Sequence, residues 1–366
     1  MINGKMLKNK ILIAAGRGHI TEVEMIKGLH RMGFDMHAAF ESTSPHLEKL
    51  RQADIPTYDL DLKSNIDLKK SLSIRRWIIE EGFSVVHGLA NRQVANFIWA
   101  SYGLHHKVVA YRGAVGHVSR WDPTCYIKWL NPRLDKIICV SHAVERDLRD
   151  SGVKSEKLAT IYKGHMSEWY EAFNSDNARQ KINSEFGTPS DAILVGMAAN
   201  MRQVKGADIL LEAMRLLPEN IYALLIGEVR DPNLRKIAEN SDIRSRVIFT
   251  GFRDDAKSMI GGLDINTAPS RGREGLTKTI IEGMAQGRPS VVSNAGGLPE
   301  MIDEGVTGFV TDVEDVTSFA ERISQLSMDP ELRARMGAQA KEVVRSRFGI
   351  EQTIQSTGKL YRELLS

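Results

Sequence analysis

The stretch VGMAANMRQVKGADILLEAM, residues 195–214, holds the unit from which the fold is built. Its apolar residues up to about Ala199 predict a buried strand, and a short polar loop follows. After Lys205 and Gly206, apolar residues recur at helical spacing. A strand that leads through a short loop into a helix is the repeating unit of a parallel sheet. The same alternation continues outward through the rest of the chain.

This alternation predicts an α/β protein of two Rossmann-like, doubly wound domains. The first-half strands are predicted at Lys10–Ala15, Asp35–Phe40, Ile55–Leu60, Ser84–His87, Lys107–Tyr111, Lys136–Val140 and Leu158–Tyr162. Those of the second half are predicted at Ile193–Ala198, Tyr222–Ile226, Val247–Thr250, Leu263–Ala268, Ser290–Ser293 and Gly308–Val310. The predicted domains span 1–173 and 192–345, with an interdomain region at 174–191 and a C-terminal helix at 346–366 that could return to the first domain.

Composition limits the class of protein. The 366 residues are 42% hydrophobic and 26% charged, which is typical of a globular protein. No apolar run approaches the roughly 20 residues of a membrane-spanning helix. The lysine-rich residues 1–10 lead only into ILIAA, too short for a secretory signal, so we expect a cytoplasmic protein. Cys125 and Cys139 form neither a disulfide framework nor a metal motif.

Charge is unevenly distributed along the chain. Residues 1–170 hold 25 Lys+Arg against 18 Asp+Glu, and residues 171–366 hold 24 against 28. This excess is too small to predict nucleic-acid binding. The basic residues of 69–77, on a helix predicted at 67–81, form either a solvated face or a contact with anionic lipid of the inner membrane. Leu68, Leu72 and Ile79 are expected to face the core, and Arg120-Trp121 and Lys128-Trp129 suggest the same lipid contact.

The most informative segment is PSRGREGLTKTIIEGMAQGRPSVVSNAGGLPEMI, residues 269–302. A helix is predicted to open around Leu276–Thr277 and to run to about Gln286. Its first amides offer an anion site suited to a diphosphate. The carboxylates of Glu274 and Glu282 suit pairs of sugar or ribose hydroxyls. Taken singly, Glu274 could instead be a partner of the helix dipole, and Glu282 a solvated helix residue.

Two cations follow the strand that ends near Ala199. Arg202 and Lys205 could neutralise a diphosphate in place of a metal ion, although two ordinary surface charges would look the same. No Asp-x-Asp pair or histidine cluster suggests a metal site. We therefore expect a metal-free diphosphate site without a cofactor.

Together these motifs resemble the retaining family-four glycosyltransferases, the group 1 enzymes with two Rossmann-like domains facing across a cleft (GT-B). The stretches IYKGH at 161–165, IFTGF at 248–252 and LDINTAPSR at 263–271 fit as well. The resemblance implies that Arg202 and Lys205 bind the donor diphosphate, Glu282 the ribose and Glu274 the donor sugar. It also places the phosphates on the backbone of Gly275, Leu276, Thr277 and Lys278, and the nucleobase near Gly251, Phe252 and Arg253.

The sequence departs from the family pattern at three places. The usual arginine before the lysine is Asn200 here, with Arg202 two residues later. The first glycine-rich loop is AAGRGHI, in which Gly16 and Gly18 remain available for donor phosphate or acceptor. Arg112 stands where many members carry a histidine near the donor sugar, and His117 follows five residues on. Either residue could act at the sugar; the other candidate imidazoles are His19 and His87.

The predicted function is transfer of a sugar from a nucleotide-diphosphate sugar to a hydroxyl of a glycan or lipid-linked acceptor, with retention, in polysaccharide or lipopolysaccharide synthesis. Glu274, Arg202, Lys205, His117 and Arg112 are the predicted catalytic residues. Two rivals remain: a sugar-nucleotide epimerase of the same fold, and a non-enzymatic sugar-binding protein. Isomerised sugar nucleotide formed without acceptor would favour the epimerase.

Overall fold

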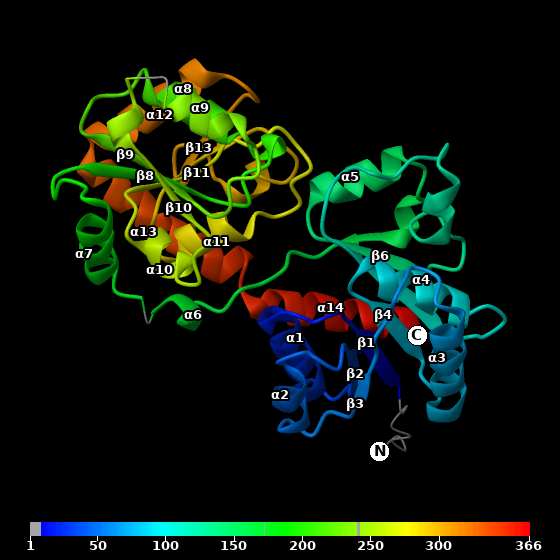
Figure 1. The fold of residues 1–366 in the computed structure, drawn as a ribbon. Helices are drawn as coiled ribbons and strands as arrows, with labels where there is room; N and C mark the ends of the chain where they lie inside the picture. Colours follow the sequence, from blue (N-terminus) through cyan, green and yellow to red (C-terminus); the bar gives the residue numbers. More distant parts are fainter. Residues whose placement is uncertain (1–8, 172, 240–241) are drawn as a thin grey trace. The chain divides into compact units, whose positions relative to one another are not determined.

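A computed structural model describes residues 9–171, 173–239 and 242–366 of the chain. The chain forms two compact units, each a parallel sheet covered by helices (Figure 1). Unit 1 ends at Gly164 and resumes from Ile350 to the C-terminus, and unit 2 is His165–Gly349. The N-terminal segment was predicted to be too short for a secretory signal. Its residues 1–8 lie outside the described residues. No helix in the described ranges has the length and apolarity that crossing a bilayer requires.

The sheet of unit 1 has the order β3-β2-β1-β4-β5-β6-β7, with all neighbours parallel. Its central strands are buried on both faces, as residues Ile11 to Ala14 of β1 show, so they appear in the sequence as continuous apolar runs. The strands are β1 (Lys10–Ala14), β2 (Asp35–Phe40), β3 (Thr57–Asp59), β4 (Val85–Gly88), β5 (Lys107–Arg112), β6 (Lys136–Cys139) and β7 (Leu158–Thr160).

Helices cover both faces of this sheet: α1 (Ile20–Arg31), α2 (Leu47–Arg51), α3 (Leu68–Glu81), α4 (Asn91–Ala100), α5 (His142–Asp150) and α14 (Ile350–Leu365). The last of these, red in Figure 1, packs beside α1 although more than 300 residues separate them. A Cβ at Gly28 of α1 would clash with Ile354, so this glycine permits the close approach. The C-terminal helix is therefore part of unit 1.

His87 is one of the residues that fix α14 to the sheet. Its Nδ1 lies 2.7 Å from the hydroxyl of Tyr361, and both side chains are almost completely buried. Burial lowers the pKa of His87 to about 3. His19 has a local structural role, because its side chain caps α1 in a capping box with Glu22. Among the candidate imidazoles, these two have roles in packing and capping.

The sheet of unit 2 has the order β10-β9-β8-β11-β12-β13, again parallel throughout. Its strands are β8 (Ile193–Ala198), β9 (Ile221–Ile226), β10 (Val247–Gly251), β11 (Ile265–Ala268), β12 (Ser290–Ser293) and β13 (Gly308–Thr311). The helices are α6 (Glu168–Glu171), α7 (Ser175–Phe186), α8 (Ala207–Met214), α9 (Asn233–Glu239), α10 (Ala256–Gly261), α11 (Lys278–Ala285), α12 (Val316–Met328) and α13 (Pro330–Arg347).

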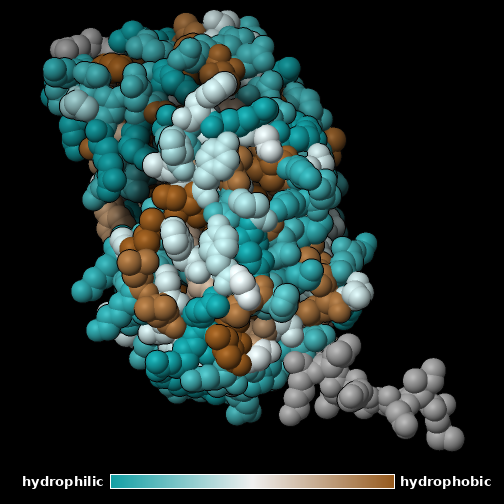
Figure 2. Space-filling model, turned by 90° about the vertical axis from the view of Figure 1, so that its right-hand side faces the viewer, coloured by the Kyte–Doolittle hydropathy of each residue, from teal (hydrophilic) through white to brown (hydrophobic). Residues whose placement is uncertain are grey.

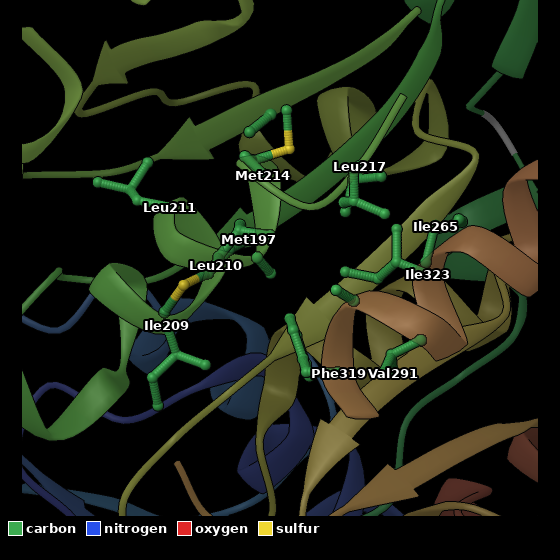
Figure 3. Packing of buried hydrophobic residues seen from close by; sticks show 14 of the residues in the cluster. Met197, Ile209, Leu210, Leu211, Met214, Leu217, Ile265, Val291, Phe319 and Ile323 are labelled. Carbon is green, nitrogen blue, oxygen red and sulfur yellow. The ribbon is translucent and has the colours of Figure 1, made fainter. Parts of the chain in front are cut away.

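One of the two hydrophobic clusters described in unit 2 lies between its sheet and the helices α8 and α12. Figure 3 shows Leu210 and Met214 of α8, together with Phe319 and Ile323 of α12, around strand residues such as Val291. All five side chains are buried. Burying a large apolar side chain contributes roughly 1.5–3 kcal/mol, so this layer fixes where α8 begins and thus where the preceding loop stands.

The predicted interdomain region is in the wrong place. Residues 174–191 contain α7, whose Ile182 is buried against Leu263 and Met259 of unit 2. The chain passes between units at Gly164–His165 and again at Gly349–Ile350, instead of at 173, 191 and 345. The polar composition of α7 arises because it buries only Ala178 and Ile182, which is why it resembles a linker.

The predicted orientation of α3 is also wrong. Leu68, Leu72 and Ile79, expected in the core, are 64%, 68% and 59% exposed, and the helix buries Ser71, Ile74 and Ile78 instead. Both sets satisfy helical spacing, so the pattern alone allowed either face. Asn96 of α4 selects the observed face, because its amide oxygen accepts hydrogen bonds from the Ser71 hydroxyl and the Asp67 amide.

Candidate functional site

A pocket of about 320 Å³ opens in unit 2 where β8 and β11 lie side by side. This is the switch point of the sheet, since β9 and β10 continue from one side of the pair and β12 and β13 from the other. Loops that leave such neighbours diverge and leave a crevice at the carboxyl ends of the strands. The polar residues that line the pocket are Asn200, Arg202, Lys205, Thr267, Ser270, Glu274, Thr277, Lys278 and Thr279.

The carboxylate of Glu274 is fixed in this pocket by hydrogen bonds from three side chains. Its Oε1 accepts hydrogen bonds from Lys205 Nζ and from Ser270 Oγ, each at 2.7 Å, and its Oε2 accepts one from Thr277 Oγ1 at 2.9 Å. The residue is only 6% exposed. A buried carboxylate needs such partners, and here a cation and two hydroxyls supply them.

Two glycines allow the loops to meet. Gly206 has φ +68°, and a Cβ there would clash with the carbonyl oxygen of Pro269. Gly296 has φ +55°, and its Cβ would clash with the carbonyl oxygen of Glu274. The next amide, of Gly297, donates to that oxygen at 3.0 Å. Backbone contacts therefore fix the position of Glu274 from two sides.

The helix α11 begins at this pocket, at Lys278 instead of the predicted Leu276–Thr277, and ends at Ala285 with Gln286 as C-cap. Its N-cap residue Thr277 makes no side-chain hydrogen bond to the helix, since its hydroxyl is given to Glu274. The first amides of α11 therefore lack a capping side chain, and the positive end of the helix dipole faces the pocket. This arrangement suits an anionic ligand.

The cations predicted at this site both line the pocket. Lys205 is held by Glu274, whereas Arg202 is largely exposed. Asn200, at the usual position of the family arginine, lines the same pocket. Ser270 and Arg271 were not among the predicted site residues. Arg271 ties the two loops together, because it pairs with Asp208 at 2.7 Å and its amide donates to Val204; its position beside the predicted strand end was the available signal.

Glu282 lies apart from the lining of this pocket. It is 3% exposed, so the alternative of a solvated helix residue is wrong. Its Oε1 lies 3.4 Å from Lys278 Nζ and has no hydrogen-bond partner among the described residues. Burial raises the pKa of Glu282 above its ordinary value. Such a carboxylate gains hydrogen bonds when hydroxyl groups reach it.

Gly251 ends β10, and Phe252 and Arg253 follow it; none of the three lines the pocket. Arg253 pairs with Glu185 of α7 at 2.5 Å and with Asp255 at 2.8 Å. Its bond to Asp255, together with one from Lys181, holds the pKa of Asp255 well below its usual range. The guanidinium is thus engaged away from the pocket. Phe252 is 70% exposed, and its predicted place near a nucleobase stays a prediction.

The remaining predicted residues belong to unit 1. Gly16 and Arg112 line a second pocket, of about 530 Å³, at the carboxyl ends of the strands. Gly18 has φ +72°, and a Cβ there would clash with Phe40. His117 is exposed with φ +62° and does not line this pocket. Of the two candidates for a contact with the donor sugar, Arg112 lines this pocket and His117 does not.

A metal site was not expected. Among the residues that the structure describes, no group of three or more His, Cys, Asp or Glu side chains is arranged to hold an ion. Metal independence stays a prediction that activity must test.

Two family models match the chain. The model described as glycosyl transferases group 1 matches residues 178–343, and the one described as glycosyltransferase family 4 matches residues 22–165. N-acetyl-alpha-D-glucosaminyl L-malate synthase of Bacillus anthracis is 25% identical over 96% of this chain and 91% of its own. A lipopolysaccharide core biosynthesis mannosyltransferase of Rhizobium leguminosarum bv. viciae is 30% identical over 66% of this chain and 68% of its own.

Solved structures share the fold. HepE of Anabaena, crystallised in complex with UDP, superposes with a TM-score of 0.81 over 98% of this chain and all of its own, at 19% identity. A glycosyltransferase of Rickettsia africae gives a TM-score of 0.83 over 98% and 99% of the two chains, at 20% identity. With its two Rossmann-like units and both family models matched, this chain belongs to the group 1 glycosyltransferases of the GT-B fold.

Proposed function

We propose that the unit 2 pocket binds the diphosphate of a nucleotide sugar, from which the enzyme transfers the sugar to an acceptor hydroxyl with retention. The observation that supports this most is the convergence of Lys205, Arg202 and the uncapped start of α11 on one pocket. Two cations and a helix N-terminus together balance the charge of a diphosphate. Glu274 then faces the transferred sugar, and Glu282 the ribose.

The main catalytic task is to stabilise the departing nucleoside diphosphate. Negative charge grows on the phosphate oxygen as the glycosidic bond breaks, and fixed cations and amides lower the energy of that state. Lys205 is bonded to Glu274 in this structure, 2.7 Å from its Oε1. We infer that Lys205 turns part of its hydrogen bonding to the phosphate when donor binds, so Glu274 becomes free to accept from a sugar hydroxyl. The acceptor proton passes to the leaving phosphate oxygen.

Binding and product release test this proposal. Calorimetry with UDP, GDP and ADP, each compared with its monophosphate, measures whether the second phosphate adds affinity. We expect at least about a tenfold gain, the value of one charge-assisted hydrogen bond. Lys205→Ala should remove most of that gain, whereas Lys236→Ala, an exposed lysine on α9 of the same unit, should not. Equal affinity for mono- and diphosphates would refute the diphosphate site.

The acceptor is proposed to belong to surface glycan synthesis, as a glycan or a lipid-linked molecule. The lipopolysaccharide mannosyltransferase named above supports this class, and HepE makes UDP the first nucleotide to test. Neither of the two curated relatives reported above is named an epimerase. Release of nucleoside diphosphate that depends on added acceptor would support transfer, while donor isomerisation without acceptor would support the epimerase instead.

We also propose that α3 contacts an anionic lipid surface on the cytoplasmic side of the membrane. Leu68, Leu72 and Ile79 form one exposed stripe along the helix, with Lys69 and Arg76 beside it. The exposed rings of Trp99 and Tyr102 are in contact with each other. Both lie near this helix, because Arg75 donates to the carbonyl of Tyr102. Figure 2, which shows the side that carries α3 and α4, has brown hydrophobic patches among teal residues. Basic residues next to exposed apolar ones are typical of helices that bind at an interface.

Vesicle sedimentation tests the lipid contact. The protein should pellet with vesicles of phosphatidylglycerol and phosphatidylcholine but not with phosphatidylcholine alone, and salt should weaken the binding. Leu72→Glu should abolish it, whereas Leu216→Glu, a control 60% exposed in unit 2, should not. Equal pelleting of the two variants would exclude α3. Of the predicted aromatic contacts, Trp121 is 93% exposed, but Trp129 is buried and cannot reach lipid.

A further inference from the structure

The pocket of unit 1, called here the Arg112 pocket, contains a buried cation with no carboxylate paired to it. Because β4 and β5 are parallel neighbours, with Gly88 opposite Ala110, the start of α4 and the end of β5 meet at one edge of the sheet. Arg112 ends β5 at this edge and lines the pocket. Residues 89–93, which lead from β4 into the first turn of α4, line it as well. The pocket volume is about 530 Å³.

Arg112 is only 8% exposed. Its Nη2 donates to the carbonyl oxygen of Gly116, and its guanidinium lies over the ring of Trp129, 4.7 Å from the ring centre. Its Nε has no hydrogen-bond partner among the described residues. Burial lowers the pKa of Arg112, and the charge of Asp147 offsets this only in part. The carboxylate of Asp147 is bonded to the Gly116 amide. A buried cation left in this state carries a desolvation cost that an anion would offset.

The start of α4 adds a second positive group to the pocket. Its N-cap is Ala90, which cannot cap, and no acidic residue stands in the first turn. The amides of residues 91–93 are therefore open to a ligand, and Ala90, Asn91, Arg92 and Gln93 all line the pocket. The helix has ten residues, long enough for a substantial dipole at this end. Arg92 places a further guanidinium at the same turn.

One acidic side chain, Glu41, also lines the pocket, beside Gly16. A carboxylate next to open space accepts hydrogen bonds from hydroxyl groups. A pocket with cations at one part and a carboxylate at another suits a ligand that carries both an anionic group and hydroxyls. A neutral sugar would leave the charge of Arg112 without a partner.

We propose that the Arg112 pocket binds an acidic, hydroxyl-bearing substrate group, with its carboxylate or phosphate between Arg112 and the first turn of α4. This inference rests on the proposed glycosyl transfer for its biological meaning. The anionic group has two possible sources: the transferred sugar of the donor, as in a uronic acid, or the acceptor. Both use the same chemistry in the pocket, and the experiment separates them.

The donor arm compares UDP-glucuronate with UDP-glucose by calorimetry on the full chain. The acceptor arm compares methyl glucuronide with methyl glucoside, and glucose 6-phosphate with glucose, each with and without saturating UDP. Within each pair the ligands differ in the charged group. We expect at least about tenfold tighter binding of the anionic member in one arm, the value of one charge-assisted hydrogen bond. Preference in the first arm assigns the group to the donor, and preference in the second assigns it to the acceptor.

Two variants test the residues. Arg112→Gln should reduce the preference to less than about twofold, whereas the control Arg31→Gln, exposed on α1 and outside the pocket, should keep it. Ala90→Asp, at an exposed position with extended backbone, should cap α4 and raise the melting temperature, yet lose the preference through like charge. Because this second variant is expected to be more stable, misfolding would not explain its result.

The outcomes separate this inference from the proposed function. Absence of binding to UDP, GDP and ADP alike in the unmodified protein would refute the diphosphate site, while the acceptor arm without nucleotide would still report on Arg112. Normal UDP binding, with no anionic preference in either arm, would overturn the present inference alone. A preference that survives both Arg112→Gln and Ala90→Asp would overturn it as well.

Discussion

The ion pair between Lys205 and Glu274 makes a prediction that separates stability from binding. Lys205→Ala leaves a carboxylate, 7% exposed, with two hydroxyl donors and no cation. Loss of one charged partner from a buried group costs about 2 kcal/mol. The double variant Lys205→Ala with Glu274→Gln should recover most of this loss, because a neutral amide does not need the cation. Urea denaturation of the four proteins in the cycle measures both numbers.

Donor affinity should behave differently in the same cycle. A phosphate contact to Lys205 contributes roughly 2–3 kcal/mol, less about 1 kcal/mol for the bond to Glu274 that weakens, so Lys205→Ala should weaken UDP binding about 5- to 30-fold. Glu274→Gln alone should bind UDP at least as tightly, because Lys205 is released, but should turn over slowly. Calorimetry with UDP measures this. If the double variant restores UDP affinity along with stability, Lys205 only supports Glu274, and the reasoning fails.

Three further predictions concern the same unit. Burial raises the pKa of Glu282 above its ordinary 4.5. The buried carboxyl therefore costs the protein no stability below about pH 4.5, where it is protonated, and it destabilises the fold as the pH rises through the folded-state pKa. Glu282→Gln should therefore melt higher than the unmodified protein at pH 7, a difference that vanishes near pH 4, while its UDP affinity falls; a variant that melts lower at pH 7 would contradict the buried charge. Gly296→Ala, at φ +55° and against the Glu274 carbonyl, should lose at least about 2 kcal/mol of stability in urea, and an unchanged midpoint would show that the loops are not held this closely. EDTA should leave turnover nearly intact, because cations and a helix terminus already face the pocket, and a full loss restored by Mg²⁺ would disprove this.

The sequence alone determined the two sheets and the parts of the pocket in unit 2. Each predicted strand overlaps an observed one. The central strands were recognised because a strand buried on both faces appears as a short continuous apolar run, whereas the edge strands β3 and β10 are less buried. The resemblance implied one donor site for Lys205 and Glu274. The structure brings the two residues together, because β8 and β11 pair side by side and end at the same edge of the parallel sheet.

Tertiary packing decided the rest. The buried face of α3 depended on Asn96, and the place of α14 depended on Gly28 and His87, all of which lie outside the helix that they fix. Likewise, the burial of Arg112 depends on Trp129, because the ring of this residue packs against the Arg112 guanidinium. Local periodicity follows from the geometry of each helix or strand. Which of two equally apolar faces is buried depends on which residues pack there, because the free energy of burial is gained only between segments that the fold brings together.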